Sequence, residues 1–425
     1  MCKAILCAVG MVMLMAGVAQ SDTFTWDGGG ANDLRTTIAN WSNDQVPASG
    51  NDYVVDGAYT IKPVDSNTDT FPGDSLTVTN NARFLLYRTN GGGEITATHT
   101  YNNLTIANAK LDPSTSGGSL NHTFPNQITL FGANSMNFSD GGYSLFMYLN
   151  GGVTGSGSVN VTRNSAGSTR ALYLSGDNSG YSGNWTISSS ASENMTFQLN
   201  NSTGWGTGNI SLGNYTRLVL NANITNTSVI TLKDAQATVI VNASKSVSVG
   251  NITNTVAGGT INNSGTLAVG ANDEDSTFSG VIAGAGTFTK TGDGTLTLGG
   301  VNTYTGNTTI SAGTLALADN AQLKFVIGAS GVNNKITGSG TLTLDGDFRF
   351  DLTGAGIASG SSWQIVDVDT LTETFGATFS VVSTLGSFTE SGGGWTIKEN
   401  GITYQFSEST GVLRVLPGGT LVSFF

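Results

Sequence analysis

Acidic residues form the grouping in this 425-residue sequence that comes closest to a catalytic or calcium-binding site. The segment DGDFRFD alternates like a β-strand, and one face of that strand would carry Asp345, Asp347, Arg349 and Asp351. Carboxylates grouped in this way can bind calcium or serve as acid and base in polysaccharide cleavage. A solvated strand face with an Arg–Asp pair has the same pattern, and we favour it. Asp345, Asp347 and Asp351 are therefore weak calcium candidates, not predicted catalytic residues.

Two further acidic segments lack the other residues that such sites need. The segment DSNTD begins like a calcium loop with Asp65 and Asp69, but Thr70 stands where that loop needs glycine. Leu76 likewise stands where the loop closes with glutamate. The run Asp273-Glu274-Asp275 has no clear partner set in the sequence. We expect no cofactor other than incidental calcium.

The sequence contains only two histidines, His99 and His122, and both lie in polar segments that are typical of turns. A metal site or a general base at these positions is the alternative to ordinary exposed loop residues, which we favour. No Ser-His-Asp arrangement can be recognised, and the only cysteines are Cys2 and Cys7. The sequence therefore predicts a protein that is not an enzyme.

The first residues predict export from the cell. Lys3 precedes an apolar run from Ala4 to Ala16, and small residues follow with cleavage sites after Ala19 or Ser21. This is the pattern of a secretory signal peptide over residues 1–21. The apolar run has 13 residues and is too short to span a bilayer, and no later run is longer, so no transmembrane segment is predicted in the mature chain. We expect a secreted or surface-exposed protein.

The composition narrows the class of partner. Charged residues make up 11% of the chain, and the net charge is −12. Because an acidic surface repels phosphate groups, nucleic acid is excluded as a partner. Surface polysaccharide, or the surface of a host or neighbouring cell, is the kind of partner that an exported protein of this composition leaves open.

Short strands with one apolar face recur along the chain. The unit Gly-Thr-Leu-x-[Leu/Val] begins at Gly265, Gly294, Gly313 and Gly340, at intervals of 29, 19 and 27 residues. Each unit places two aliphatic side chains on one face, and a single strand cannot bury that face alone. Stacked repeats predict an all-β fold, a right-handed parallel β-helix. A β-sandwich is the alternative, which explains the alternation but not the repeats.

A longer pair of matching segments carries a family resemblance. Residues 280–317, GVIAGAGTFTKTGDGTLTLGGVNTYTGNTTISAGTLAL, and a weaker copy in residues 152–188 share Tyr-[Ser/Thr]-Gly-Asn-[Trp/Thr]-Thr-Ile-Ser. This pattern resembles the autotransporter-associated β-strand repeat of exported bacterial passenger proteins. The start, FTWDGGGAND…ANWSNDQVP, is similar to the segment that precedes such repeats. The resemblance implies a secreted or surface-exposed β-helix, often adhesin-like, and transfers no catalytic residue.

Four regions follow from these features. We predict a signal peptide over 1–21, an N-terminal cap over 22–75, β-helix repeats over 76–345, and a C-terminal β cap over 346–425. Trp26 and Trp41 suit a segment that folds over the first coil, and WTIKENGITYQF predicts an antiparallel hairpin with a type I′ turn at Asn400-Gly401. Residues 346–425 contain only short apolar runs, so we expect no translocating barrel there.

The predicted function is a structural or adhesive role at the cell surface, without catalysis. The alternative is an extracellular β-helix protein that binds or degrades polysaccharide. Tyr181, Trp185 and Tyr304 could stack on sugar rings if they are exposed, although aromatic residues in repeats more often pack inside turns.

Overall fold

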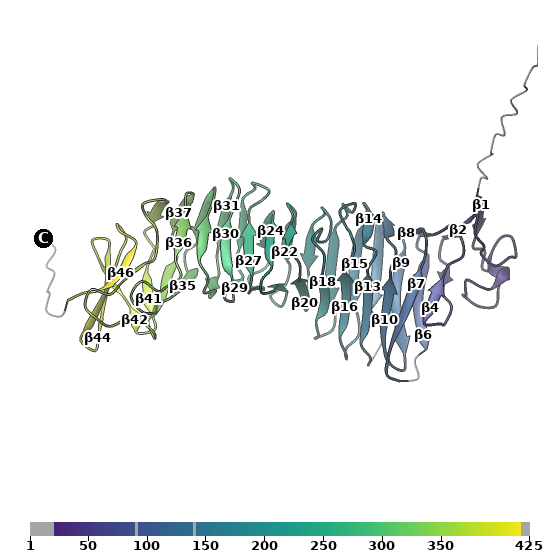
Figure 1. The fold of residues 1–425 in the computed structure, drawn as a ribbon, viewed down its shortest axis with the longest axis horizontal. Helices are drawn as coiled ribbons and strands as arrows, with labels where there is room; N and C mark the ends of the chain where they lie inside the picture. The colour runs from purple at the N-terminus through teal and green to yellow at the C-terminus, as the bar shows by residue number, and fades with distance from the viewer. Residues whose placement is uncertain (1–20, 90–91, 139–141, 418–425) are drawn as a thin grey trace, which may run out of the picture.

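The computed structural model describes residues 21–89, 92–138 and 142–417, so residues 1–20 of the predicted signal peptide lie outside the described residues. The described chain is an elongated stack of short strands, with the N-terminal strands at one end and the C-terminal sheet at the other (Figure 1). Its only helix in these ranges is the 3₁₀ turn η1 (Ile38–Asn40). The chain passes through about 13 coils. Their strands form six ladders, two on each of three sides of the stack, which we call faces 1, 2 and 3.

Face 1 is built from two six-stranded ladders that are separated by irregular coils. The first contains β1 (Asp22–Thr25), β2 (Asn51–Asp56), β5 (Ser75–Thr79), β8 (Leu104–Ala107), β11 (Ile128–Phe131) and β14 (Val153–Gly155). The second contains β21 (Ile224–Thr225), β24 (Ser246–Val249), β27 (Thr266–Val269), β30 (Thr287–Lys290), β33 (Thr308–Ile310) and β36 (Ile336–Gly338).

Face 2 is built from a nine-stranded and a five-stranded ladder. The first contains β3 (Thr60–Ile61), β6 (Arg83–Thr89), β9 (Lys110–Ser116), β12 (Ala133–Phe138), β15 (Ser158–Arg163), β17 (Trp185–Ser189), β19 (Ile210–Leu212), β22 (Val229–Leu232) and β25 (Asn251–Asn254). The second contains β28 (Ser276–Phe278), β31 (Thr295–Leu298), β34 (Thr314–Leu317), β37 (Thr341–Leu344) and β40 (Thr372–Phe375).

Face 3 is built from a ten-stranded and a five-stranded ladder. The first contains β4 (Thr68–Thr70), β7 (Glu94–Thr100), β10 (Ser119–Phe124), β13 (Leu145–Leu149), β16 (Arg170–Leu174), β18 (Met195–Leu199), β20 (Thr216–Leu220), β23 (Thr238–Val241), β26 (Thr260–Asn263) and β29 (Val281–Ala283). The second contains β32 (Val301–Asn302), β35 (Gln322–Val326), β38 (Asp347–Asp351), β41 (Val381–Ser383) and β42 (Gly386–Ser387).

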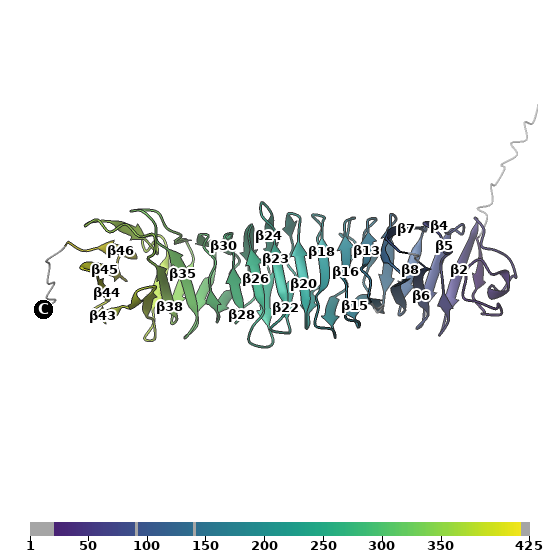
Figure 2. The same ribbon diagram turned by 90° about the horizontal axis from the view of Figure 1, so that it is seen from below.

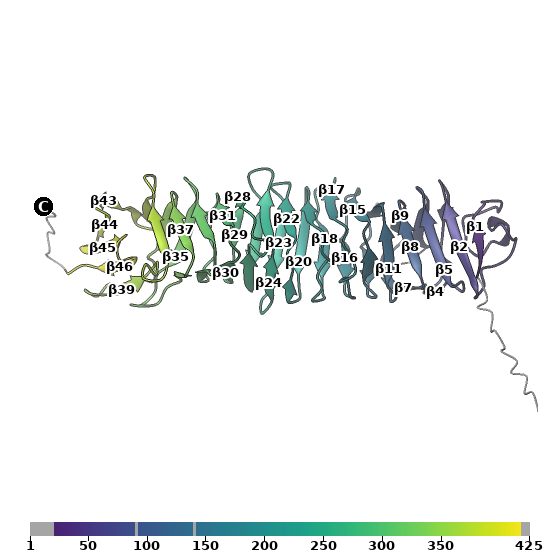
Figure 3. The same ribbon diagram turned by 90° about the horizontal axis from the view of Figure 1, so that it is seen from above.

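The strand pairing confirms the predicted parallel β-helix and not the β-sandwich. Neighbouring strands in all three faces pair in parallel, and the exception is β42, which folds back on β41. The faces follow the long axis of the molecule (Figures 2 and 3). Parallel pairing begins between β1 and β2 and continues to β41, so the ladders cross the predicted domain boundaries after residues 75 and 345.

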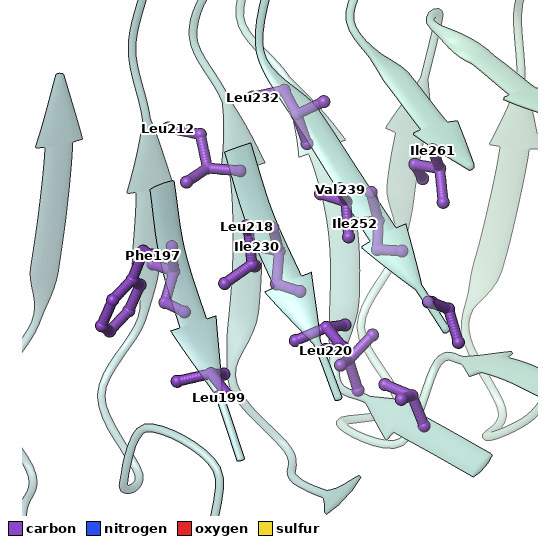
Figure 4. Close-up of a cluster of buried hydrophobic side chains, with 14 of the residues drawn as sticks. Phe197, Leu199, Leu212, Leu218, Leu220, Ile230, Leu232, Val239, Ile252 and Ile261 are labelled. Carbon is purple, nitrogen blue, oxygen red and sulfur yellow. The ribbon is translucent and has the colours of Figure 1, made fainter. Parts of the chain in front are cut away.

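The core forms because alternate side chains of every strand point inward and stack on their equivalents in the next coil. On face 3, Phe197, Leu218 and Val239 occupy successive positions of one column. On face 2, Ile230 lies directly beside Ile252 in the next coil. Figure 4 shows these side chains filling the space between the faces. The outward positions of the strands carry mainly Thr, Asn and Ser. This explains why apolar and polar residues alternate in the sequence.

The Gly-Thr-Leu units occupy two different faces. The units that begin at Gly294, Gly313 and Gly340 form β31, β34 and β37, which pair in register on face 2. The unit that begins at Gly265 forms β27 on face 1 instead. A shared pattern therefore indicates a strand of the solenoid, but it does not say which face the strand joins.

The C-terminal end is a five-stranded antiparallel sheet of β39 (Ser362–Gln364), β43 (Thr389–Ser391), β44 (Gly394–Glu399), β45 (Ile402–Ser407) and β46 (Val412–Val415). Asn400 and Gly401 have φ angles of 51° and 82°, as the predicted type I′ hairpin requires. Phe406 packs against Phe348 and Phe350 of β38, with ring centroids 5.7 and 5.8 Å away. The predicted antiparallel cap is thus confirmed, and it covers the last coil.

The N-terminal end is closed by aromatic side chains. Trp26 and Trp41 are buried with ring centroids 5.0 Å apart, and Trp41 packs edge-on against Tyr53 of β2 at 4.9 Å. These rings cover the apolar interior of the first coil, which has no neighbour on that side among the described residues.

Candidate functional site

Two of the three candidate calcium residues lie on one strand. Asp347 and Asp351 belong to β38 and alternate with buried phenylalanines, so both lie on the outer side of face 3 with Arg349. Asp345 lies in the bend before the strand. The predicted shared face is therefore found for Asp347, Arg349 and Asp351, and Asp345 lies outside this strand.

The carboxylates of β38 bind neighbouring side chains. Asp347 accepts hydrogen bonds from Ser380 Oγ at 2.5 Å and from Gln322 Nε2 at 3.1 Å. Asp351 Oδ2 lies 3.0 Å from Lys324 Nζ in the adjacent strand. These contacts join successive coils, and Asp351 pairs with Lys324 instead of with Arg349, the partner that the solvated-face interpretation named. Calcium binding at Asp345, Asp347 and Asp351 stays a prediction.

The acidic run at residues 273–275 borders a shallow polar groove on face 2, where the two ladders of that face meet. Asp273 Oδ1 accepts the backbone N–H of Asp293 at 3.0 Å, and Asp275 Oδ1 accepts that of Thr295 at 2.6 Å. Two of the three carboxylates therefore bind the next coil. The groove is lined by Val229, Asn251, Thr253, Asn272, Glu274, Asp275, Ser276, Thr277, Thr295 and Thr297. In the described part of the chain, no three or more His, Cys, Asp or Glu side chains gather as a metal site would need.

The structure separates the two aspartates of DSNTD. Asp65 is exposed and lies 3.7 Å from Arg88, whereas Asp69 is buried inside the solenoid. Asp69 Oδ1 lies 2.5 Å from Arg35 Nη2, and Asp69 Oδ2 accepts a hydrogen bond from Tyr101 Oη at 2.7 Å. This segment is therefore no calcium loop, because one carboxylate already has a buried cation as its partner.

The prediction that the histidines are exposed loop residues is wrong. His99 lies in β7 and His122 in β10, and both side chains point into the core with at most 2% exposure. His99 Nε2 lies 3.0 Å from His122 Nδ1, so the two rings share a hydrogen bond. His99 Nδ1 lies 3.6 Å from Asp69 Oδ2, which is an electrostatic contact rather than a formed hydrogen bond. We call Arg35, Asp69, His99, Tyr101 and His122 the buried polar cluster.

Burial and charge shape the protonation of this cluster. Burial alone would raise the pKa of Asp69, but its contacts with His99 and Arg35 outweigh burial and lower the pKa to about 2. Burial and the nearby His99 lower the pKa of His122 well below its usual value. All five residues are at most 4% exposed, so a substrate in solution does not reach them. The side chains of the buried polar cluster are of types that can relay protons. Because the cluster lies inside the solenoid, we interpret it as a structural feature.

Acidification below about pH 6.5 should destabilise the fold, because the unfolded chain then binds a proton at His122 that the folded chain refuses. Above about pH 6.5 His122 is neutral in both the folded and the unfolded chain, so it does not reduce the free energy of unfolding. Below that pH the free energy of unfolding falls as the pH falls. His99 and Arg88 are the charged or titratable groups that act on this ring, and Asp69, which contacts His99, has a pKa of about 2.

Thermal unfolding between pH 7.5 and 5 measures this effect. We expect the midpoint of the parent to fall with pH and that of His122→Phe, which keeps the stacked ring, to fall less. A parent midpoint that is flat over this range would contradict the assignment.

The aromatic residues of the matching repeats are buried, which corrects the idea that they stack on sugars. Tyr181, Trp185 and Tyr304 are at most 3% exposed. Tyr181 Oη donates to Gly157 O at 2.5 Å, and Trp185 Nε1 donates to Trp205 O at 3.1 Å. These rings fill the corners between coils, as the turn-packing alternative expects.

The glycine that the repeats share is needed because neighbouring coils come too close for a side chain. A Cβ atom at Gly183 would lie 2.0 Å from Gly157 O, and one at Gly306 would lie 2.1 Å from Gly286 O. Such distances are far below van der Waals contact, so any larger residue would push the coils apart.

The asparagine that follows this glycine binds the next coil. Asn184 Oδ1 accepts the backbone N–H of Asn209 at 2.7 Å, and Asn307 Oδ1 accepts that of Lys335 at 3.1 Å. An N–H at a corner of the solenoid has no ladder partner, and the asparagine side chain supplies one. The Gly-Asn pair of the repeat therefore supports the stacking of the coils.

Sequence reasoning missed three outward aromatic side chains on face 3, which we call the aromatic platform: Phe146, Tyr148 and Tyr173. The rings of Tyr148 and Tyr173 are stacked, with centroids 4.5 Å apart and planes at 4°. Phe146 lies 6.5 Å from Tyr148 and 6.3 Å from Tyr173. The signal was present in LFMYL, where Phe146 and Tyr148 alternate with three buried apolar residues.

Comparison with known proteins confirms the resemblance at the repeats. Residues 169–189 and 288–317 match the family model described as passenger-associated-transport-repeat. The first segment spans β16 and β17, and the second spans strands from β30 to β34. No curated protein and no solved structure matches the chain. Together the repeats and the solenoid resemble an autotransporter passenger domain. Within the described ranges, no helix has the length and apolarity that crossing a bilayer requires.

Proposed function

We propose that this protein is an exported passenger-type module that acts at the cell surface in a structural or adhesive role, without catalysis. One observation carries this proposal. The matched repeats lie in a continuous parallel solenoid, and in both repeats the shared Gly allows neighbouring coils to approach closely while the shared Asn binds the next coil. A stack of this kind offers long outer faces for contact with another surface.

The partners we propose are a surface polysaccharide or the surface of a host or neighbouring cell. The net charge of −12 disfavours nucleic acid and anionic lipid. Few charged side chains and many Thr, Asn and Ser hydroxyl and amide groups suit a hydrogen-bonded, neutral partner.

Surface location is tested by treating intact bacterial cells that make the full chain with proteinase K, followed by immunoblotting of cells and medium. We expect the protein in the medium, or degraded on intact cells while a cytoplasmic marker stays whole. Retention of the protein in the cytoplasm, protected from the protease, would contradict export.

The polysaccharide-degrading alternative has one observation in its favour, the groove with Glu274 and Asp275. The purified protein is incubated with pectin, alginate and xylan, with and without calcium, and reducing ends are counted. We expect no release. Release that Glu274→Gln or Asp347→Ala abolishes would establish an enzyme in place of our proposal.

A further inference from the structure

The C-terminal end of the solenoid closes two of its three faces by backbone pairing. On face 1, Ile336 of β36 forms a parallel bridge with Val366. Ile336 N–H donates to Ile365 O at 2.9 Å, and Asp367 N–H donates to Ile336 O at 3.0 Å. On face 3, β42 folds back on β41. On face 2, β40 is the last strand of its ladder, and no other strand of the described ranges pairs with its outer edge. Face 2 therefore ends in an open edge.

Alternate residues of β40 direct their backbone groups to this open edge. Thr372 N–H donates to Gly340 O at 3.2 Å, so the backbone of Thr372 points to β37. Because successive N–H groups of a strand point to opposite sides, those of Glu373 and Phe375 point away from β37. Donors and acceptors on such an edge can pair with a strand of another chain.

Glu373 occupies an inner position of this edge strand. The column that it continues consists of three leucines, each at most 2% exposed, which are register partners in β31, β34 and β37: Leu296, Leu315 and Leu342. Glu373 is the partner of Leu342 in the next strand. It is partly buried, whereas Thr372 and Thr374 beside it are exposed. A leucine column thus ends in a carboxylate on the face whose edge is open.

Ion pairing does not explain a glutamate at this position. None of the ion pairs formed among the described residues includes Glu373. Without a cation, its carboxylate depends on the water that reaches the end of the stack. A further strand on the open edge would remove that water, and burial of an unpaired charge is costly.

We propose that Glu373 prevents the open edge of face 2 from pairing with the same edge of a second copy of this chain. Because Trp26 and Trp41 close the N-terminal end, the matching strand of the second copy is its own β40. Antiparallel pairing of the two strands about a two-fold axis would bring both Glu373 carboxylates to the same side of one sheet. The two like charges would repel, and both would lose water.

The proposal goes beyond the surface role and does not depend on it. An inward-pointing charge is one of the ways in which edge strands avoid pairing with other chains. Leucine at position 373 would instead continue the apolar column to the edge, where a second copy could bury it. Glu373→Leu is therefore expected to turn a dispersed protein into one that associates through β40.

Size-exclusion chromatography with light scattering compares the purified proteins at equal concentrations. We expect the parent to have the mass of one chain and Glu373→Leu to have about twice that mass or more. Glu373→Val is a second variant, since a β-branched residue also suits a strand, and it should associate in the same way. Circular dichroism shows whether each variant keeps the β-structure of the parent.

Two controls separate edge pairing from a general gain of apolar surface. Glu373→Pro removes the same charge but also the N–H group at the open edge, so it should keep the mass of one chain. Glu399→Leu makes the same substitution at an exposed position of β44, and it should likewise keep that mass.

The inference is overturned if Glu373→Leu and Glu373→Val, once folded, keep the mass of the parent. It is also overturned if Glu373→Pro or Glu399→Leu associates as strongly as Glu373→Leu. Association of a chain that ends at residue 417 would contradict it as well, because residues 418–425 would then protect the edge in place of Glu373. The protease test on intact cells is independent of these outcomes, so surface export can hold even if this inference fails.

Discussion

Asp69→Asn is expected to lower the free energy of unfolding by about 3–5 kcal/mol, the usual cost of removing one partner of a buried ion pair. Asp69 is the buried anion that balances Arg35, whose side chain is 5% exposed and lies 2.5 Å from it. Asparagine can still accept the hydrogen bond from Tyr101, but it leaves the guanidinium group without a counter-charge inside the first coils.

Chemical denaturation of the parent and two variants at pH 7.5 measures this effect. Asp65→Asn is the matched control, because Asp65 lies four positions earlier but is exposed. That change should alter stability by less than about 1 kcal/mol, as exposed ion pairs usually do. Equal stabilities for Asp69→Asn and Asp65→Asn would show that the buried polar cluster contributes nothing to the fold.

Removal of residues 395–425 is expected to cause association or aggregation. The truncation deletes most of β44 together with β45 and β46, and it uncovers Phe348 and Phe350 of the last coils. The exposed end then presents apolar side chains beside unpaired strands, which can template another chain. Gly401→Val should act in the same direction more weakly, because φ at this position is 82° and a β-branched residue tolerates it poorly.

Light scattering at equal concentrations compares these proteins with the parent. A chain that ends at residue 417 keeps every described strand and controls for the loss of length. If the protein lacking residues 395–425 stays as dispersed and as heat-stable as this control, the C-terminal sheet is not a cap.

The strands, their stacking and the C-terminal hairpin could be predicted from the sequence because each depends on local patterns. Alternation of apolar residues defines a strand, repetition demands a neighbour, and Asn400-Gly401 defines a turn. The face that each strand joins could not be predicted, because all three faces bury aliphatic residues at the same spacing. The Gly265 unit therefore lies on face 1, although it reads like its three relatives on face 2.

The polar interior could not be predicted for a related reason. Arg35, Asp69, His99 and His122 are far apart in the sequence and meet only through the stacking of coils. The segment TATHTYNN looks like a turn because its outward residues are Thr and Asn, yet Ala97 and His99 alternate with them and point inward. For Tyr181 and Trp185 the alternation likewise does not distinguish a buried corner from an exposed one.

The central claim is that the repeats are successive coils of one parallel solenoid, and paired cysteines test it most directly. Thr297 and Ala316 are register partners in β31 and β34, and Ala316 is in turn the partner of Thr343 in β37. In a chain without Cys2 and Cys7, Thr297→Cys with Ala316→Cys places two thiols on adjacent strands about 4.8 Å apart. Thr297→Cys with Thr343→Cys places them two strands, about 9.6 Å, apart. We expect mild oxidation to form an intramolecular disulfide in the first protein and to leave both thiols free in the second. Free thiols in the first protein, or a disulfide in the second, would contradict the register and with it the stacked-repeat account.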